Sequence, residues 1–416
     1  MSHSLSKVEI CAPVGSLESL AAAINGGANS IYFGAGKLNM RSHSSANFAK
    51  KDIPRVLSKC RKANVKSYLA LNSIIYDDEY EEACSFINIA KELGVSAVIL
   101  SDLGLMEYAH SIGISVHVSV QMNVANFATL KYLSRYADVF VLARELSLRQ
   151  VSNIASRIES EELKGPSGEK VRLELFIHGA LCVAVAGTCG MSLFTYGKSS
   201  MRGECYQNCR RRYRVYDDET GNEFVVDNQY IMSPKDLCCI RILDKIIESG
   251  VSILKIEGRG RSPDYVYKTT KVYSEALRRI KNKSFDVEFI KEAEKELSFV
   301  YNRGFWHGGY YLGDRSGEWS AISGGKNVLK KVFAGKILNY FPKASCAEAN
   351  LQSEGLKIGD LIMIIGPTTG CYELEVKSLR IDNINFSKAK KGETVTFPVS
   401  EKVRKGDKLY ILKNSQ

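Results

Sequence analysis

The feature that most constrains the fold of this chain is a regular alternation between short apolar runs and helix-length segments. The apolar runs are four to six residues long, and such strands are typical of parallel sheets that are covered on both faces. Eight strand–helix pairs within about 280 residues predict an α/β fold, a (β/α)₈ TIM-like barrel. The predicted strands are Val8 to Pro13, Ser30 to Phe33, Lys66 to Leu71, Ala97 to Leu100, Val116 to Val120, Val139 to Leu142, Leu173 to Ile177 and Ile253 to Ile256.

The alternative fold is an open, doubly wound sheet with two extra units. No G-x-G-x-x-G pattern follows the first strand, which argues against a dinucleotide-binding sheet. The composition, 45% hydrophobic and 25% charged, excludes a chain that is disordered throughout, and no apolar run is long enough to predict a membrane span. Because Met1 to Ser6 is polar, without an apolar secretory region, we expect a cytoplasmic protein with reduced cysteines.

Breaks in the alternation divide the chain into three parts. The barrel covers residues 1–283 and contains a cysteine-rich insertion, residues 179–232, after the seventh strand. Residues 284–328 form a helical linker and a glycine-rich segment, and residues 329–416 form a small antiparallel β-barrel. A helix is predicted over Pro234 to Ser249, with Cys238 and Cys239 at its start. In the last part, strands are predicted at Val332 to Phe341, Leu361 to Ile365, Cys371 to Ser378, Arg380 to Phe386, Glu393 to Val399 and Lys408 to Leu412.

Polar side chains follow most of the barrel strands, where a (β/α)₈ barrel places its reactive groups. Amides and arginines at these ends predict a site for an anionic, oxygen-rich ligand. The candidate binding residues are Arg41, Asn72, Gln121, Arg144 and Arg259, and the candidate catalytic residues are Asp102, His178 and Glu257. Any one of these residues could equally well form a strand-end hydrogen bond or a helix cap. Because all of them lie on one rim, however, a shared role in a functional site is the better interpretation of the set.

Six of the eleven cysteines lie within sixty residues on the expected catalytic side. They are Cys182, Cys189, Cys205 and Cys209 in the insertion, with Cys238 and Cys239 after it. Converging thiolates hold Zn²⁺ or an iron–sulfur cluster. The tight C-x2-C pairs of structural zinc sites are absent, and the spacing C-x6-C-x15-C with a distant fourth ligand at a helix start favours a [4Fe–4S] cluster. Buried structural cysteines are the alternative.

A basic segment is interleaved with these cysteines. Between residues 198 and 214 it carries six cations against the single acid Glu204, so it contributes +5 to the chain's formal charge of +11. The cations are Lys198, Arg202, Arg210, Arg211, Arg212 and Arg214, and four tyrosines lie among or beside them. Arginines bind phosphates and tyrosines stack on bases, so the segment predicts an RNA-binding surface; an ordinary solvated loop, or shielding of an anionic cluster, is the alternative.

The sequence gives little support for a hydrolytic active site. Neither a G-x-S-x-G elbow nor an H-E-x-x-H helix is present, and the six histidines are scattered. His178, at the end of the seventh strand, is a candidate general base, although a neighbour of the cluster or a hydrogen-bonded rim residue is the simpler interpretation.

Several of these segments resemble the collagenase-like peptidase family U32. Its pattern is matched by Glu174 to Cys182 (ELFIHGALC), Cys189, Ser233 to Cys238 (SPKDLC) and Lys255 to Arg259 (KIEGR). Ala12 to Gly15, Tyr32 to Gly34, Met40-Arg41 and Asn47-Phe48 are similar to its N-terminal motifs. The resemblance covers about residues 8–320, and the C-terminal part is similar to the translation-factor-type β-barrel of many members.

The resemblance implies a cytoplasmic enzyme. The better understood members are oxygen-independent hydroxylases with a [4Fe–4S] cluster that act on transfer RNA, ribosomal RNA or a quinone precursor, while the family name implies a protease. The transfer-RNA branch implies 5-hydroxylation of the wobble uridine, with transfer RNA and a paralogous chain as candidate partners. It implies Cys182, Cys189, Cys205 and Cys238 as cluster ligands, with Cys209 as the alternative to Cys205. Arg41, Arg144 and Arg259 would bind prephenate, the hydroxyl source. A zinc-stabilised RNA-binding module without catalysis is a further alternative.

Overall fold

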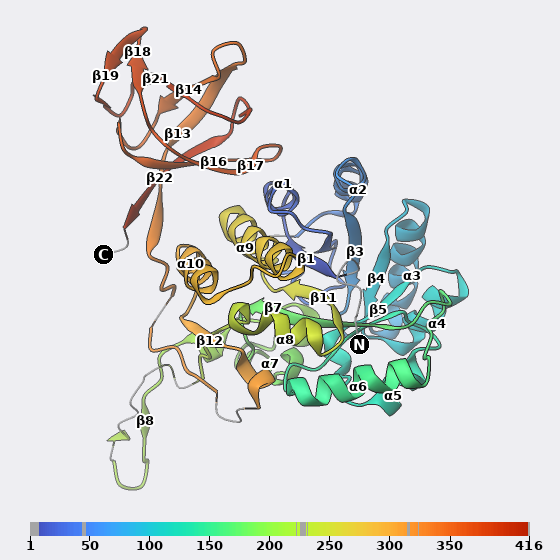
Figure 1. Ribbon diagram of the computed structural model, residues 1–416. Helices are drawn as coiled ribbons and strands as arrows, with labels where there is room; N and C mark the ends of the chain where they lie inside the picture. Colours follow the sequence, from blue (N-terminus) through green and yellow to red (C-terminus); the bar gives the residue numbers. More distant parts are fainter. Residues whose placement is uncertain are drawn as a thin grey trace.

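The computed structural model describes residues 8–43, 47–221, 223–224, 230, 232–313, 317–322 and 324–414. Its larger part is a closed barrel of parallel strands surrounded by helices (Figure 1). β11 pairs in parallel with both β1 and β7, which closes the barrel and confirms the predicted (β/α)₈ architecture. The barrel strands are β1 (Glu9–Val14), β2 (Ser30–Gly34), β3 (Lys66–Leu71), β4 (Ala97–Leu100), β5 (Val116–Val118), β6 (Val139–Val141), β7 (Arg172–Gly179) and β11 (Val251–Ile256).

Helices cover the outside of the barrel, and several begin at a side-chain cap. Ser16 Oγ, for example, accepts a hydrogen bond from the Ser19 amide at 3.2 Å at the start of α1. The helices are α1 (Leu17–Asn25), α2 (Ile53–Lys62), α3 (Asp77–Glu92), α4 (Leu103–Ser111), α5 (Phe127–Leu133), α6 (Leu148–Ser160), α7 (Met191–Tyr196), α8 (Leu243–Glu248), α9 (Pro263–Lys281) and α10 (Val287–Ser298). Among the described residues, no helix is both long and apolar enough to cross a membrane. Residues 1–6, on which the expected location rests, lie outside the described residues.

The barrel strands bury both of their faces. Outward-facing side chains pack against the helices in the main hydrophobic core. Inside the barrel lies a small separate cluster of Cys11, Tyr32, Tyr68, Ala70, Ala97, Ile99, Val139 and Ile253. Side chains alternate along a strand, so Glu9 shares the inner face with Cys11, and Lys255 shares it with Ile253. The barrel interior therefore contains charged groups as well as apolar ones.

The segment after the insertion differs from the prediction. Asp236–Cys238 forms strand β10, which runs antiparallel to the end of β7 and parallel to β12 (Phe305–His307). Helix α8 begins only at Leu243, so the predicted helix over Pro234 to Ser249 is wrong in its first half. The backbone groups of β10 find partners in two neighbouring strands, and this pairing outweighs local helix preference. Cys238 therefore does not lie at a helix N-terminus.

The C-terminal part is a separate antiparallel sheet with its own buried core, seen above α1 and α9 in Figure 1. It docks on the barrel through β17: a Cβ atom on Gly370 would lie 2.8 Å from the backbone nitrogen of Ala22, so only glycine permits this approach. The main strands are β13 (Leu329–Phe341), β14 (Cys346–Leu351), β16 (Leu361–Gly366), β17 (Gly370–Glu375), β18 (Leu379–Ile381), β19 (Ile384–Phe386), β21 (Thr394–Pro398) and β22 (Lys408–Asn414). Two small pairs, β15 (Leu356–Lys357) with β20 (Lys388–Ala389) and β8 (Val215–Tyr216) with β9 (Glu223–Phe224), complete the strands.

Two features of this sheet were not predicted. Residues 380–386, expected as one strand, form the β18–β19 hairpin, whose turn residues Asp382 and Asn383 have positive φ values of 50° and 66°. Strand β14 was missed because its inward side chains include Ala347 and Ala349, which have low β propensity.

Candidate functional site

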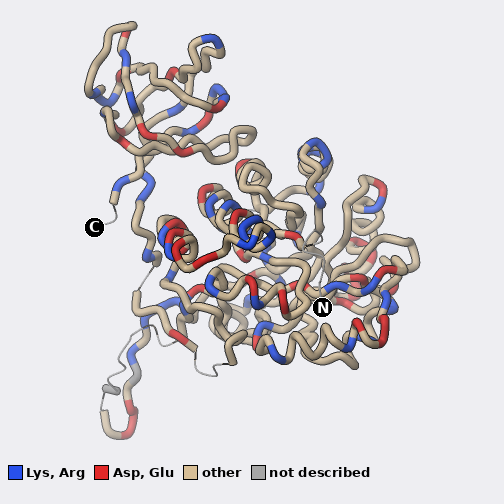
Figure 2. Tube along the Cα trace, viewed as in Figure 1, with Lys and Arg blue, Asp and Glu red and all other residues tan. Residues whose placement is uncertain are grey.

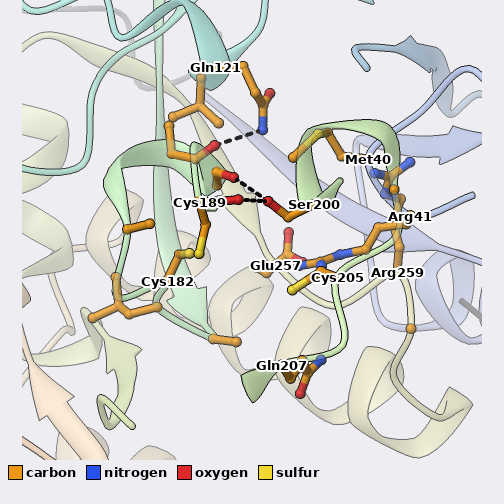
Figure 3. Close-up of a pocket in the computed structure, with 18 of the residues that line it drawn as sticks. Met40, Arg41, Gln121, Cys182, Cys189, Ser200, Cys205, Gln207, Glu257 and Arg259 are labelled. Atoms are coloured by element: carbon orange, nitrogen blue, oxygen red, sulfur yellow. Dashed lines mark hydrogen bonds and ion pairs between the residues drawn. The ribbon is translucent and has the colours of Figure 1, made fainter. Parts of the chain in front are cut away.

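A cavity of about 750 Å³ opens at the C-terminal end of the barrel strands, beneath the cysteine-rich insertion (Figure 3). This volume is within the range of roughly 300–1,000 Å³ that small-molecule sites occupy. The residues singled out from the sequence that line it are Arg41, Asn72, Gln121, Arg144, Cys182, Cys189, Cys205, Cys209, Arg210, Glu257 and Arg259. Asp102, His178 and Cys238 do not line it.

Asp102 and His178 each make contacts that give the side chain a structural role. Asp102 is the N-cap of α4, where its carboxylate accepts a hydrogen bond from the Leu105 amide at 2.9 Å. His178 is buried among Tyr265, Tyr273 and Phe305, and its Nδ1 lies 3.3 Å from the Tyr273 hydroxyl. Burial, and then the charge of Arg261, lowers the pKa of His178 to about 3. Because neither residue lines the cavity, neither is a candidate for catalysis.

The neutral state of His178 predicts a stability effect. An unfolded chain protonates its histidines near pH 6.5, whereas folded His178 stays neutral down to about pH 3, so the unfolded state binds the additional proton between these values. Stability is therefore lost as the pH falls through this window, by about 2 kcal/mol between roughly pH 7.5 and 5. Urea denaturation should show that His178→Phe loses less stability on acidification than the wild type. The exposed His110→Gln should behave as the wild type does; equal slopes for all three proteins would contradict the neutral buried state.

One wall of the cavity carries a carboxylate surrounded by arginines. Arg41 Nη2 lies 3.0 Å from Glu257 Oε1, and the Tyr32 hydroxyl donates to Glu257 Oε2 at 3.1 Å. Burial alone would raise the pKa of Glu257, but Arg41, Arg144 and Arg259 outweigh it and lower the pKa to about 2. Glu257 is therefore an ionised counter-charge to the arginines at neutral pH, and a poor general acid.

Arg259 and Arg144 present guanidinium groups to the same space. Arg259 is buried, and its Nη1 donates to Asn39 Oδ1 at 3.1 Å, while its Nε has no hydrogen-bond partner among the described groups. Arg144 stacks 4.0 Å over the Phe176 ring and donates to the Ala180 carbonyl at 3.0 Å. Together these guanidinium groups give this wall a positive charge that suits an anionic ligand.

Lys255 is a lining residue that the sequence interpretation missed. Its ammonium group, 4.4 Å from the centre of the Tyr32 ring, lies 2.6 Å from Glu174 Oε1, and Glu174 Oε2 lies 3.3 Å from His117 Nδ1. All three side chains are almost completely buried. Burial would raise the pKa of Glu174, but the neighbouring Lys255 overcomes this and the pKa falls to about 2. The sequence did carry a signal for these residues, since each is an ionisable residue inside a mostly apolar predicted strand.

An amide network joins the barrel to the insertion. Asn72 Nδ2 donates to Ser119 Oγ at 3.0 Å and to Gln121 Oε1 at 2.9 Å, and Gln121 Nε2 donates to the Ala186 carbonyl at 3.3 Å. Ser200 Oγ bonds the carbonyls of Gly187 and Cys189 within the insertion, as the dashed lines in Figure 3 show. Asn72 and Gln121 thus position the cysteine-bearing loop over the cavity.

Four thiols line this cavity, and they come from separate turns of the insertion. Figure 3 shows the sulfur atoms of Cys182 and Cys189 on one side of the cavity and that of Cys205 on another. Cys209 lies within electrostatic reach of the other three: burial raises the pKa of its thiol, Arg210 lowers it, and Cys182, Cys205 and Cys189 raise it. Cys238 lies instead in the core, fully buried, with its sulfur 3.9 Å from the Tyr273 hydroxyl.

The thiols that line the cavity include Cys209 and not Cys238, which was expected as the fourth ligand. Among the described residues, no three His, Cys, Asp or Glu side chains approach closely enough to hold a single metal ion. A single Zn²⁺ draws thiolates to about 2.3 Å from one centre, whereas in a [4Fe–4S] cluster each thiolate binds a different iron. The four cavity thiols could each serve as the ligand of a different iron, as such a cluster would need.

The predicted RNA-binding arginines divide into two groups. Arg202 forms a bidentate ion pair with Glu79 at 2.6 and 2.7 Å, and Arg210 donates to the carbonyls of Leu181 and Pro234, so both hold the insertion together. Arg211, Arg212, Arg214 and Lys198 are exposed. Over the whole molecule, basic and acidic residues are mixed in both parts (Figure 2).

Comparison with known proteins identifies the family of this chain. The model of peptidase family U32 matches residues 15–321. The chain is 46% identical to a collagenase of Porphyromonas gingivalis, over 97% of each chain. It is 27% identical to tRNA hydroxylation protein P1 of Bacillus subtilis, over 87% of this chain and 84% of that protein. It is 31% identical to a 23S rRNA 5-hydroxycytidine synthase of Escherichia coli, over 79% of this chain and 48% of that protein. The chain therefore belongs to peptidase family U32, whose members include proteins named as collagenases and as RNA hydroxylation proteins.

Proposed function

We propose that this protein is an RNA-modifying iron–sulfur enzyme that hydroxylates the wobble uridine of transfer RNA at C5, without oxygen and with prephenate as the source of the hydroxyl group. The observation that carries the proposal is the placement of four thiols on one basic cavity at the mouth of the barrel. Relatives named as tRNA and rRNA hydroxylation proteins support the class of reaction.

Cys182, Cys189, Cys205 and Cys209 would hold the cluster. When bound, a [4Fe–4S] cluster supplies one-electron chemistry whose potential depends on burial and hydrogen bonding. The amide of Met191 already donates to Cys189 Sγ at 3.4 Å, the kind of hydrogen bond to sulfur that tunes the potential of such a cluster. Arg210, whose charge lowers the pKa of the Cys209 thiol, would compensate the negative charge of the site.

The arginine-lined wall would bind the organic acid. Arg41, Arg144 and Arg259, with Lys255 at the inner end, present four cations against the carboxylates of Glu257 and Glu174. Prephenate carries two carboxylates, so it would pair with the guanidinium groups of this wall and neutralise the excess positive charge. The remaining volume of the cavity would admit the target base.

A peptidase is the second candidate, favoured by the name of the Porphyromonas relative. Of the histidines in the described part of the chain, only His43 lines the cavity, where its Nε2 lies 3.6 Å from Glu204 Oε1. A cysteine or serine peptidase needs a nucleophile within hydrogen-bond reach of that base. Among the described residues, no hydrogen bond joins His43 to a thiol or hydroxyl, so this geometry supports the hydroxylase better.

Mass spectrometry of nucleosides from a strain lacking this gene tests the proposal. We expect 5-hydroxyuridine to disappear from its transfer RNA, to return with the wild-type gene and to stay absent with Cys182→Ala. Cys346→Ala, which changes a half-buried cysteine of the C-terminal sheet, should complement as the control. Unchanged 5-hydroxyuridine would reject the proposal. A loss of 5-hydroxycytidine from ribosomal RNA, or a change in quinones, would reassign the substrate, and collagen cleavage that requires His43 would favour the peptidase.

A further inference from the structure

Helix α7 of the insertion presents large apolar side chains to solvent beside the cavity. Phe194 is 92% exposed, Leu193 50% and Tyr196 40%, and Tyr206, which lines the cavity, is 52% exposed. The Tyr196 and Tyr206 rings lie 5.1 Å apart between centroids. We call these four residues the aromatic platform. The four exposed side chains come from one short helix and the segment that packs against it, which makes this part of the insertion a candidate interaction site.

The platform is held in place from beneath. Asn208 Nδ2 donates to Thr195 Oγ1 at 2.9 Å and to the Met191 carbonyl at 3.3 Å, and buried Ser192 accepts from the Tyr206 amide at 3.0 Å. The Phe194 ring folds back over Gly190, where a Cβ atom would lie 3.0 Å from the ring. Gly190 directly follows Cys189 in the chain, so the exposed ring packs against the backbone beside a cysteine that lines the cavity. The hydrogen bonds and packing beneath helix α7 therefore hold Phe194 in its exposed position.

Cations border the platform. The Arg211 guanidinium lies 5.4 Å from the centre of the Tyr196 ring and donates to the Tyr196 hydroxyl. Lys198, two residues beyond Tyr196, lies 3.3 Å from Glu204 and is exposed, and exposed Arg212 donates to the Tyr230 hydroxyl at 3.0 Å. Exposed rings among flexible cations are the combination that binds single-stranded nucleic acid: the rings stack on bases and the cations contact phosphates.

We propose that the aromatic platform is a stacking site for unpaired RNA bases, with Phe194 as its principal contact, and that it holds the nucleotides flanking the target at the mouth of the cavity. The inference rests on the proposed function for the identity of the RNA, and adds a contact for the bases beside the target. In a duplex the base faces are covered by their neighbours, so only splayed bases offer a free face to Phe194. The bordering charge favours RNA over an apolar protein partner.

Fluorescence anisotropy with a labelled anticodon stem–loop, and with a blunt RNA duplex of the same length, tests the platform. We expect Phe194→Ala and Phe194→Leu to weaken stem–loop binding about ten-fold and Phe194→Trp to retain it, since stacking needs a ring and not only apolar volume. Binding of the duplex should not change. The matched control is Tyr132→Ala, which removes a 53% exposed ring from α5 on the outside of the barrel.

Two outcomes would overturn the inference. One is stem–loop affinity that Phe194→Ala leaves within two-fold of the wild type. The other is a wild-type dimer that Phe194→Ala converts to a monomer in light scattering without loss of RNA affinity, because a second copy of the chain would then cover the platform. The binding assay uses protein purified in air and needs no turnover. The affinity for RNA could depend on Phe194 while deletion of the gene leaves 5-hydroxyuridine unchanged. That pair of results would support the platform and reject the proposed reaction.

Discussion

Replacing Cys209 by alanine is expected to prevent assembly of the proposed iron–sulfur cluster, whereas replacing Cys238 by alanine is expected to leave it intact. Cys209 lines the cavity together with Cys182, Cys189 and Cys205, and all three affect the pKa of its thiol. Cys238 lies on β10, fully buried beside Tyr273 and away from the cavity wall. A [4Fe–4S] cluster needs a thiolate for each coordinated iron, so removal of a cavity thiol breaks the site and removal of a core thiol does not.

Iron and sulfide analysis after anaerobic reconstitution distinguishes the two variants. We expect about four irons per chain for the wild type and for Cys238→Ala, and a large loss for Cys209→Ala, with activity reduced at least about 100-fold. Cys238→Ala should lower the free energy of unfolding by about 1 kcal/mol, since it leaves a small void in the core. The reverse pattern, iron lost with Cys238→Ala and kept with Cys209→Ala, would mean that the insertion rearranges and that the ligand set implied by family resemblance is the correct one.

Replacing Lys255 by methionine is expected to reduce both the stability of the barrel and its affinity for an organic dianion. Methionine keeps apolar volume between the Tyr32 and Phe176 rings but leaves the Glu174 carboxylate buried without its ion-pair partner at 2.6 Å. Breaking a buried ion pair from one side costs about 3–5 kcal/mol. The lost cation at the inner end of the cavity should also weaken prephenate binding about 100-fold. Urea denaturation measures the first effect and titration calorimetry the second.

A second substitution separates the two effects. Lys255→Met combined with Glu174→Gln removes the unpaired charge, so most of the stability should return while the affinity for prephenate stays low. Lys271→Met, which changes an exposed lysine on α9, is the control and should alter neither quantity. If Lys255→Met binds prephenate as tightly as the wild type, the ammonium group of Lys255 takes no part in ligand binding and its role is confined to pairing with Glu174.

Much of the site could be predicted because strand ends can be located from local sequence. Arg41, Asn72, Gln121, Arg144, Glu257 and Arg259 follow apolar runs, and the ends of parallel strands meet at one rim, where the structure places all six. Asp102 and His178 obey the same spacing but serve as a helix cap and a buried core residue. Spacing locates a residue on the rim but does not say which way its side chain points.

Residues inside the barrel were harder to predict. Glu174, His117 and Lys255 lie in strands that read as apolar, and their ion pairs join β5, β7 and β11. No local pattern shows that these three ionisable side chains, far apart in the sequence, face one another, because the inward face of a strand is defined only when the barrel closes. In the C-terminal sheet, likewise, Ala347 and Ala349 become inward residues only through pairing of β14 with β13 and β21.

By itself the sequence determined the succession of strands and helices, the parallel barrel and the polar rim, because hydrophobic periodicity and strand ends are local properties of the chain. Only the tertiary structure decided which four of the six clustered cysteines share the cavity. Cys238 was expected at a helix start, but β10 pairs with β7 and β12, and this long-range pairing turns its thiol into the core while the insertion brings Cys209 to the cavity wall. Backbone hydrogen bonding between distant segments, which no local pattern encodes, made that choice.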